Sequence, residues 1–386
     1  MSSKSVIGCP YAKKCGGCQL QNMDYNRQLK FKQAKAVSLL GRFHRVYDII
    51  GMKNPYNYRN KVQAAFGLTR GGKIVSGVYQ SSSHRIVNVD KCMIEDKKAD
   101  EIIVFIRSVL PEYRIIPYNE DSKKGFLRHV LVKRSFSTGQ IMVVFVGANA
   151  VFPQKNNITK RLLKEFPEIT TVVFNINPHK TSMLLAEREE VLFGKGYIED
   201  NLCGLKFRIS PKSFYQINPF QTKVLYEKAI EYAELDKSQT VIDAYCGTGT
   251  IGLTASKYAG KVIGVELNPD AVKDAKINAK INGVENARFF KGDAGEFMTE
   301  AAKENLHIDV VFMDPPRAGS DKPFLSSLIK LSPKKIVYIS CNIETQKRDL
   351  LYLVKNGYSV RKIQPVDMFP HTSHVESVVL LTRKEK

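Results

Sequence analysis

Apolar and polar residues alternate in short stretches along the first two hundred residues of the chain. This period of two, interrupted by glycine-rich turns such as TRGGK, predicts antiparallel strands. The predicted strands are KVQAAFGL (61–68), KIVSGVYQ (73–80), HRIVNVD (84–90), LRHVLVKR (127–134), QIMVVFVG (140–147), TTVVFNIN (170–177) and SMLLAERE (182–189). Helical spacing instead predicts a basic amphipathic helix over 24–40 and a second helix over 156–166.

From about residue 205 the pattern changes, and predicted strands alternate with predicted helices. This order is typical of an α/β domain with a parallel sheet and crossover helices. The seven strands are predicted at 240–246, 261–267, 287–293, 309–314, 335–341, 359–367 and 376–383. Only FPHTSHV joins the last two, which is too short for a helical crossover, so they should form an antiparallel hairpin. We therefore expect three segments: 1–95, a β-rich segment 96–205, and an α/β domain 206–386.

Charge is distributed unevenly along the 386 residues, whose formal net charge is +21. Residues 1–150 carry 25 Lys and Arg against 10 Asp and Glu, whereas the remainder carries 34 against 28. A basic first part joined to a nearly balanced second part indicates a polyanionic partner, although a basic protein without such a partner remains the simpler alternative.

The chain start, MSSKSVIGCPY, lacks the apolar stretch of a secretory signal, and no apolar run approaches the length of a membrane span. We therefore expect a cytoplasmic protein with no membrane partner. In a reducing compartment its seven cysteines should be thiols, metal ligands or catalysts rather than disulfides.

The stretch DAYCGTGTIG (243–252) follows a predicted buried strand and begins a helix. Its glycines, of which Gly247 is the first, have the G-x-G-x-x-G spacing that lets a backbone approach a nucleotide closely. Glu266, at the end of the next strand, is placed to bind ribose hydroxyls. This pattern fits NAD-dependent dehydrogenases as well as methyltransferases.

Three features favour a methyltransferase. Asp243 ends the strand before the glycine loop, and Asp293 ends the third strand in GDA, where it could meet an adenine amino group. The third feature is the terminal antiparallel hairpin.

Several further motifs accompany this loop: SFYQINPFQTKVLY (213–226), FMDPPRAG (312–319), VYISCN (337–342) and HTSHVESVVLL (371–381). With these motifs the chain resembles the RNA uracil-5-methyltransferases, a family of class I S-adenosylmethionine-dependent enzymes with a Rossmann-like fold. The resemblance is to the iron–sulfur type that acts on 23S rRNA. It implies that cofactor contacts fall on Gln216, Tyr245, Gly247, Thr250, Glu266, Asp293 and Asp314.

The same resemblance places the family's nucleophile on Cys341 and its general base on Glu376. Carbon 5 of uracil is a poor nucleophile, and addition of a thiolate to carbon 6 makes it reactive. A carboxylate is then needed to remove the proton from carbon 5. The alternatives are a small buried core residue for Cys341 and a solvated strand-start carboxylate for Glu376. Cys203 and Cys246 lack such companion motifs and are interpreted as structural.

Four other cysteines, Cys9, Cys15, Cys18 and Cys92, resemble the set that holds a 4Fe–4S cluster in many family members. Four thiolates suit such a cluster, but zinc also accepts four cysteines, so the residues alone leave both metals open.

Larger family members carry an additional N-terminal β-barrel, and here the first of these cysteines already stands at residue 9. We therefore expect the basic iron–sulfur and β-rich region to bind the RNA. Basic and aromatic side chains suited to this are Tyr56, Tyr58, Arg59, Phe126, Arg128 and Arg134, although the sequence fits ordinary sheet-surface residues almost equally well.

The sequence thus predicts a monomeric uridine-5-methyltransferase acting on 23S rRNA, with tRNA as the second candidate. A non-catalytic RNA-binding protein and an NAD-dependent dehydrogenase are the alternatives from other classes. The first would not need the cofactor motifs, and the second would not account for Cys341 together with the terminal hairpin.

Overall fold

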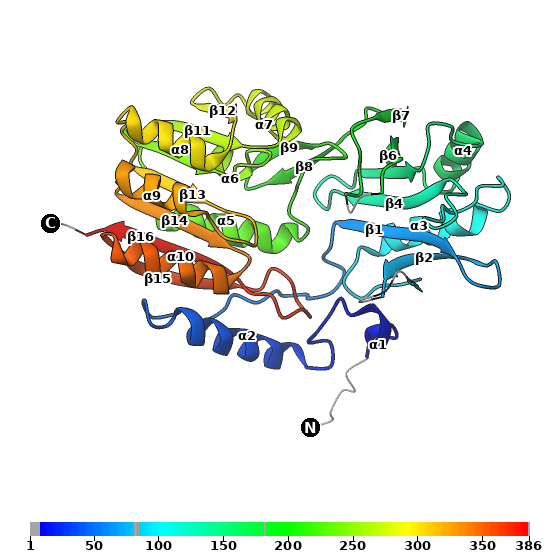
Figure 1. The fold of residues 1–386 in the computed structure, drawn as a ribbon, viewed down its shortest axis with the longest axis horizontal. Helices are drawn as coiled ribbons and strands as arrows, with labels where there is room; N and C mark the ends of the chain where they lie inside the picture. The colour runs from blue at the N-terminus through cyan, green and yellow to red at the C-terminus, as the bar shows by residue number, and fades with distance from the viewer. Residues whose placement is uncertain (1–7, 81–82, 84, 181–182, 385–386) are drawn as a thin grey trace. The chain divides into compact units, whose positions relative to one another are not determined.

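The computed structural model describes residues 8–80, 83, 85–180 and 183–384, and the chain forms two compact units (Figure 1). Unit 1 contains Met1–Asn22, Asn54–Asp200 and Arg208–Lys212, and unit 2 contains Met23–Lys53, Asn201–Phe207 and Ser213–Lys386. These units differ from the three expected segments, because the 95/96 boundary lies inside unit 1 and residues 23–53 belong to unit 2.

Unit 1 is built on a seven-stranded sheet in the order β3-β2-β1-β4-β5-β6-β7. Its strands are β1 (Lys61–Leu68), β2 (Ile74–Tyr79), β3 (Ile86–Asn88), β4 (Leu127–Arg134), β5 (Ile141–Gly147), β6 (Ile169–Ile176) and β7 (Glu189–Phe193). All neighbours are antiparallel except β5 and β6, which are joined through helix α4 (Lys155–Glu165). This unit is therefore the β-rich α+β region that the alternating pattern predicted.

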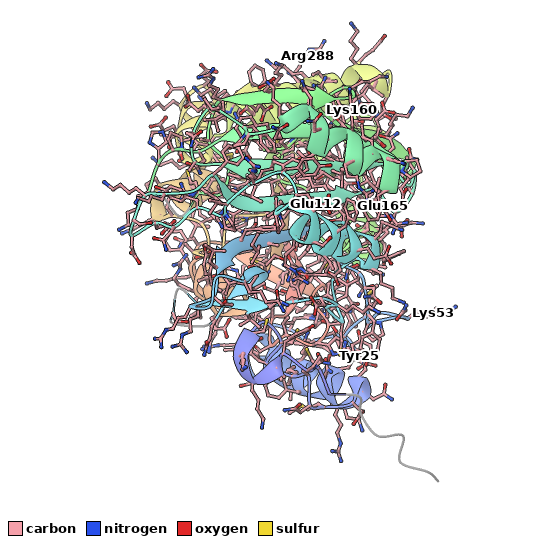
Figure 2. All side chains as sticks on the ribbon, turned by 90° about the vertical axis from the view of Figure 1, so that its right-hand side faces the viewer. Tyr25, Lys53, Glu112, Lys160, Glu165 and Arg288 are labelled. Atoms are coloured by element: carbon pink, nitrogen blue, oxygen red, sulfur yellow. The ribbon has the colours of Figure 1, made fainter. Side chains whose placement is uncertain are left out.

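Helices α3 (Lys97–Val109) and α4 cover one face of this sheet. Alternate strand residues such as Val130 and Phe145 point to that face and pack against Ile106 of α3 and Leu162 of α4. The opposite side of α4 exposes charged side chains, including Lys160 and Glu165 (Figure 2). The alternation of strand residues thus fixes which face of the sheet is the core.

Unit 2 contains a second seven-stranded sheet, in the order β12-β11-β10-β13-β14-β16-β15. Its strands are β10 (Thr240–Ala244), β11 (Lys261–Glu266), β12 (Ala287–Lys291), β13 (Val310–Met313), β14 (Lys335–Ser340), β15 (Tyr358–Val366) and β16 (Glu376–Arg383). The first five are parallel, and β16 is antiparallel to both β14 and β15. The predicted class I methyltransferase sheet with its antiparallel terminal hairpin is confirmed.

Helices cover both faces of this sheet, as a doubly wound fold requires. The helices are α5 (Pro219–Ala233), α6 (Thr250–Ser256), α7 (Pro269–Ile281), α8 (Ala294–Lys303), α9 (Lys322–Leu331) and α10 (Ile343–Lys355). One continuous core joins Met298 of α8, Phe324 of α9 and Leu350 of α10 to the strands. Strands β8 (Ile198–Leu202) and β9 (Leu205–Ile209) form a separate two-stranded sheet.

Helix α2 (Tyr25–Leu40) also belongs to unit 2, although it lies near the start of the chain. Asp24 caps its first turn by accepting a hydrogen bond from the Arg27 backbone N–H. Ala36 and Leu40 enter the same core as α8 to α10, and α2 lies along β15 and α10 (Figure 1). The short helix α1 (Ala12–Cys15) remains in unit 1.

Two local features differ from the sequence prediction. Residues 183–188 form no strand, and β7 begins only at Glu189, so the strand predicted over 182–189 is wrong within the described residues. Helix α3 was not predicted. In the part of the chain that the structure describes, no helix combines the length and apolar character needed to cross a membrane.

Candidate active site

Strand register brings three predicted residues to one edge of the unit 2 sheet. Ser340 pairs with Ser377 across the antiparallel β14–β16 ladder, so Cys341 and Glu376 are the next residues at that end. Asp314 follows Met313, the last residue of β13, which pairs in parallel with Tyr338 of β14. The carboxyl ends of these parallel strands are where open α/β sheets bind their ligands.

The Glu376 carboxylate is buried, with 2% of the residue exposed, and its Oε2 has no hydrogen-bond partner. Burial raises the pKa of Glu376, the negative charge of Asp314 raises it further, and Arg317 lowers it. Burial likewise raises the pKa of Asp314. A buried carboxylate with an unpartnered oxygen and a raised pKa is suited to accept a proton at near-neutral pH.

Burial also raises the pKa of the half-buried Cys341 thiol to about 11, with further contributions from Glu376 and Asp314. Arg317 opposes these effects. Without substrate the thiol is therefore protonated at neutral pH, and formation of the thiolate needs either a base or added positive charge nearby.

The loop that carries Arg317 is attached to the turn that carries the thiol. The Arg317 carbonyl oxygen accepts hydrogen bonds from Asn342 Nδ2 at 3.0 Å and from Thr345 Oγ1 at 3.2 Å. The Arg317 guanidinium lies 3.4 Å from His374 Nε2, two residues before Glu376. The motifs DPPR, SCN and HVE, which are separate in the sequence, therefore meet in one place.

The glycine loop shows why its third glycine is required. Asp243 Oδ2 accepts a hydrogen bond from the Gly252 backbone N–H at 2.7 Å, and a Cβ on Gly252 would lie 2.9 Å from that oxygen. Burial raises the pKa of Asp243 to about 8, and its Oδ1 has no hydrogen-bond partner. Gly247 has a φ of 54°, and a Cβ there would meet no atom within 4 Å.

These features fit the cofactor that the sequence predicts. The unpartnered buried oxygen of Asp243 can accept a hydrogen bond from a polar ligand group, such as the amino group of an amino-acid moiety, and Gly247 leaves open space in the same loop.

Glu266 and Asp293 lie at the ends of the next two strands, as predicted, and both have local roles. Glu266 accepts hydrogen bonds from the backbone N–H groups of Gly247 at 3.0 Å and Asn268 at 2.8 Å. Asp293 caps α8 through Oδ1, which accepts from the N–H groups of residues 295 and 296. Their contact with ribose and adenine therefore stays a prediction. It is compatible with the hydrogen bonds by which Glu266 holds the glycine loop and Asp293 caps α8.

Gln216 and Thr250 are both hydrogen-bonded to Tyr226, a residue that was not predicted from the sequence. The hydroxyl of Tyr226, on α5, is hydrogen-bonded to Thr250 Oγ1 at 3.2 Å and to the Gln216 side chain. Burial raises the pKa of Tyr226, and Asp314 and Asp243 raise it further. Tyr226 thus lies near three predicted site residues, Gln216, Thr250 and Asp314, and its place at the end of the 213–226 motif was the available signal.

Tyr245 has a left-handed backbone conformation, with a φ of 65°. Its ring packs against Phe324, and its hydroxyl lies 3.4 Å from Ser320 Oγ. The described contacts of Tyr245 therefore shape the loop, and its predicted contact with a cofactor stays a prediction.

The four N-terminal cysteines all lie in unit 1. Burial raises the pKa of the Cys18 thiol to about 11, and the neighbouring Cys15 and Cys9 raise it further. The Cys92 N–H donates to Asp100 Oδ2 at 2.7 Å, and the charge of Glu95 raises the pKa of both Cys92 and Cys18. No group of three or more His, Cys, Asp or Glu side chains has metal-holding geometry within the described ranges, so the predicted metal centre is not shown.

Some of the side chains expected to contact RNA are not accessible. Tyr58 is 1% exposed and Phe126 4% exposed. Arg128 is buried and donates hydrogen bonds to the carbonyl oxygens of Asn177 and His179. For these three residues the sequence prediction is wrong, because their aromatic and basic character serves the fold of unit 1.

Comparison with known proteins gives consistent matches. A model of the tRNA (uracil-5-)-methyltransferase family matches residues 181–384. An uncharacterized RNA methyltransferase of Oceanobacillus iheyensis is 46% identical over 96% of this chain and 82% of its own length. One from Clostridium acetobutylicum is 46% identical over 98% of this chain and 84% of its own.

A solved structure is also similar over almost the whole chain. The Pyrococcus abyssi tRNA (uracil-54, C5)-methyltransferase, in complex with S-adenosyl-L-homocysteine, has a TM-score of 0.79 and 29% sequence identity. The match covers 99% of this chain and 87% of that one.

Proposed function

Because the chain belongs to the tRNA (uracil-5-)-methyltransferase family, we propose that it transfers a methyl group to carbon 5 of a uridine in RNA. The family and its relatives support the general reaction, S-adenosylmethionine-dependent methylation of RNA. The observation that carries the finer proposal is the adjacency of a thiol and a buried carboxylate, Cys341 and Glu376, at the strand edge.

In the proposed reaction, the Cys341 thiolate forms a bond to carbon 6 of uracil, and the electron pair of the C5–C6 double bond moves toward carbon 5 and the O4 carbonyl. S-adenosylmethionine would supply the methyl group: its methyl–sulfur bond breaks as carbon 5 bonds to the methyl carbon, and S-adenosylhomocysteine leaves. This is covalent catalysis, in which one difficult step is divided into easier ones.

Glu376 acts in the last step. Its carboxylate takes the hydrogen on carbon 5 as a proton, and the C–H electron pair re-forms the C5–C6 double bond while the bond to Cys341 Sγ breaks. The thiolate leaves, and the methylated uridine is released. Arg317, the cation beside this site, would stabilise the thiolate.

The RNA target is either tRNA or 23S rRNA. The sequence motifs favour 23S rRNA, whereas the Pyrococcus abyssi structure is that of a tRNA methyltransferase. Unmodified transcripts of both RNAs, incubated with the protein and labelled methyl donor and then mapped, would identify the uridine. A target base must leave its stack to reach Cys341, so we expect a uridine in a loop.

The reaction has a direct test. A transcript with 5-fluorouridine at the target should remain attached to the protein, because the base at Glu376 cannot remove fluorine as a proton. An adduct that forms equally well with Cys341→Ala would contradict the proposed nucleophile.

We further propose that Cys9, Cys15, Cys18 and Cys92 hold a 4Fe–4S cluster. The donor set suits such a cluster chemically, and the electrostatic effects of Cys9 and Cys15 on Cys18 support their proximity. No catalytic step is assigned to this centre.

A further inference from the structure

The loop of residues 367–375 joins β15 to β16 and ends immediately before Glu376. It contains no helix or strand. Val366 pairs with Glu376, so both ends of the loop meet at the active-site edge. A catalytic base must be held within hydrogen-bond distance of the proton it removes, and an irregular loop needs side-chain contacts to hold it there.

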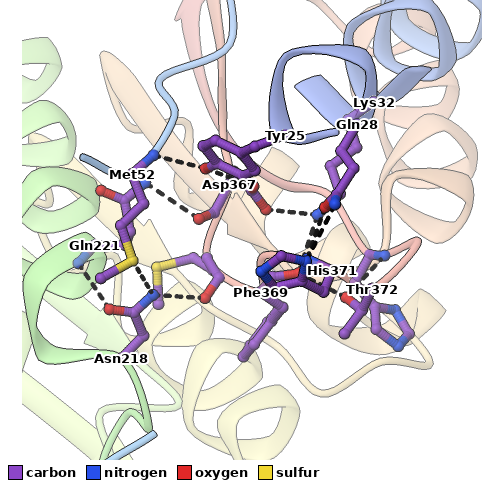
Figure 3. A network of polar contacts seen from close by, with 12 residues as sticks. Tyr25, Gln28, Lys32, Met52, Asn218, Gln221, Asp367, Phe369, His371 and Thr372 are labelled. Carbon is purple, nitrogen blue, oxygen red and sulfur yellow. Dashed lines mark hydrogen bonds and ion pairs between the residues drawn. The ribbon is translucent and has the colours of Figure 1, made fainter. Parts of the chain in front are cut away.

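Helix α2 supplies a buried ion pair to the start of this loop (Figure 3). Lys32 Nζ lies 2.5 Å from Asp367 Oδ1, and both side chains are fully buried. The Tyr25 hydroxyl donates to Asp367 Oδ2 at 2.9 Å and accepts from the Met52 N–H at 2.7 Å. Lys32 Nζ also donates to the Phe369 carbonyl oxygen at 3.0 Å.

One turn earlier on α2, Gln28 binds His371 through both ends of its amide. Gln28 Oε1 accepts from the His371 backbone N–H at 2.9 Å, and Gln28 Nε2 lies 3.1 Å from His371 Nδ1. Because Oε1 is the acceptor, Nε2 is the donor, and His371 must accept at Nδ1 as a neutral ring protonated at Nε2. Gln28 is 0% exposed and His371 2% exposed.

The backbone of His371 is itself unusual, with a φ of 70°. A histidine without glycine's freedom occupies this left-handed region only when its surroundings hold it there. The two Gln28 hydrogen bonds provide such a constraint.

Helix α5 holds the same loop through its first turn. Asn218 Nδ2 donates to the Met368 carbonyl oxygen at 2.9 Å. Gln221 Nε2 donates to the Asp367 carbonyl oxygen at 3.1 Å. The loop is thus bound by buried side chains at residues 367, 368, 369 and 371, and α2 contributes the charged and the bidentate contacts.

We propose that Gln28 and Lys32 of α2 are positioning residues that hold the 367–375 loop so that Glu376 can remove the proton from carbon 5. This inference rests on the proposed uridine-5-methyltransferase function and deepens it. It assigns the segment 23–53, which contains none of the predicted catalytic or cofactor motifs, a role in the removal of the proton from carbon 5.

The test separates that step from the earlier ones. Cys341 attack and methyl transfer precede proton removal, so a displaced Glu376 should leave adduct formation intact and slow its resolution. We expect Gln28→Ala to slow product release about 10- to 100-fold on the transcript that the wild type methylates, with methylated covalent adduct accumulating. Quenched time courses on denaturing gels measure both quantities.

Gln33→Ala is the matched control. Gln33 lies on the same helix and also makes two backbone hydrogen bonds, to the Tyr47 carbonyl oxygen at 3.2 Å and from the Ile49 N–H at 2.8 Å. It does not contact the 367–375 loop through either bond. We expect Gln33→Ala to lower stability without changing the ratio of adduct to product.

A second pair of variants, His371→Asn and His371→Ala, distinguishes loss of positioning from misfolding. Asparagine tolerates a positive φ and can accept at Oδ1, so His371→Asn should restore resolution of the adduct relative to His371→Ala. Equal loss of adduct formation and product release in folded Gln28→Ala, or no difference from Gln33→Ala, would overturn the positioning role. Absence of any covalent adduct between the wild type and the 5-fluorouridine transcript would instead contradict the proposed function.

Discussion

The proposed catalytic edge of unit 2 and the cysteine set of unit 1 are both groups of reactive side chains whose members lie far apart in the sequence. Asp314, Cys341 and Glu376 each stand at the end of a strand, so hydrogen-bonded register places them together. The four cysteines lie on α1, in loops and in an irregular segment around residue 92, where no ladder relates them. A regular sheet therefore assembles a site by its backbone, whereas a loop site depends on individual contacts or on a bound metal.

The largest effect should come from removing the thiol at the catalytic edge. Cys341→Ala should lower methyl transfer by at least about 1,000-fold and abolish the 5-fluorouridine adduct, because it removes the group proposed to add to carbon 6. Cys203→Ala, which changes another half-buried cysteine of unit 2, should retain activity. Labelled-methyl incorporation measures both. Retained incorporation of labelled methyl groups into RNA by Cys341→Ala would contradict the assignment of this edge as the active site.

Glu376→Gln should lower product release by about 100- to 10,000-fold, because the amide cannot accept the proton. The wild-type rate should rise as pH increases through the neutral range, since burial raises the pKa of Glu376 and its basic form returns only at higher pH. The variant should lack this rise in the rate at which a preformed adduct is resolved. A variant profile parallel to that of the wild type would assign the base elsewhere.

The same pKa shift has the opposite sign for stability. The fold prefers protonated Glu376, so the free energy of unfolding should decrease as pH rises from about 4.5 through the raised pKa. Glu376→Gln should show a smaller decrease. Denaturant titrations at pH 5 and pH 9 compare the two proteins.

Lys32→Met should destabilise unit 2 by about 3–5 kcal/mol, because it leaves the buried Asp367 carboxylate without its cation. Lys303→Ala, which removes an exposed pair with Glu300, should cost at most about 1 kcal/mol. Equal effects in urea titrations would mean that the buried pair contributes no more than a surface one. Replacing both Lys32 and Asp367 with apolar residues should recover part of the loss.

The smallest effect on catalysis should come from the cysteine set, to which no step of the reaction is assigned. Protein purified without oxygen should show broad brown absorbance and bound iron, both lost in Cys92→Ala. Methyl transfer should fall less than in Glu376→Gln. Colourless protein with one equivalent of zinc would replace the iron–sulfur proposal with a zinc site.

The sequence predicted the parts of the molecule in which a local pattern is tied to a regular element. The apolar runs placed Cys341 and Glu376 at strand ends, whereas their proposed roles came from the family resemblance. The short connection between the last two strands required an antiparallel hairpin. Gly252 could be selected because its spacing reflects the close approach of Asp243.

The remaining features depended on which elements pack together, which an apolar pattern does not specify. The helix at 24–40 was predicted as basic and amphipathic, but that pattern does not show that Lys32 is fully buried against Asp367. Phe126 and Arg128 were predicted to contact RNA from their aromatic and basic character. Their burial depends on the tertiary fold, which the local sequence does not show. The strand predicted over 182–189 failed because an apolar stretch, MLLA, does not reveal whether a neighbouring strand is available for pairing.

The ion pair between Lys32 and Asp367 joins residues 335 positions apart. At about 5–20 residues per second, a ribosome needs roughly 20–70 s to synthesise the intervening chain. During that time the buried face of α2 has no partner from the terminal hairpin, and the sheet of unit 2 is incomplete until β16 has been made. Folding of this unit therefore waits for the synthesis of Asp367 and β16, and a chain released before residue 367 would leave Lys32 without its counter-charge.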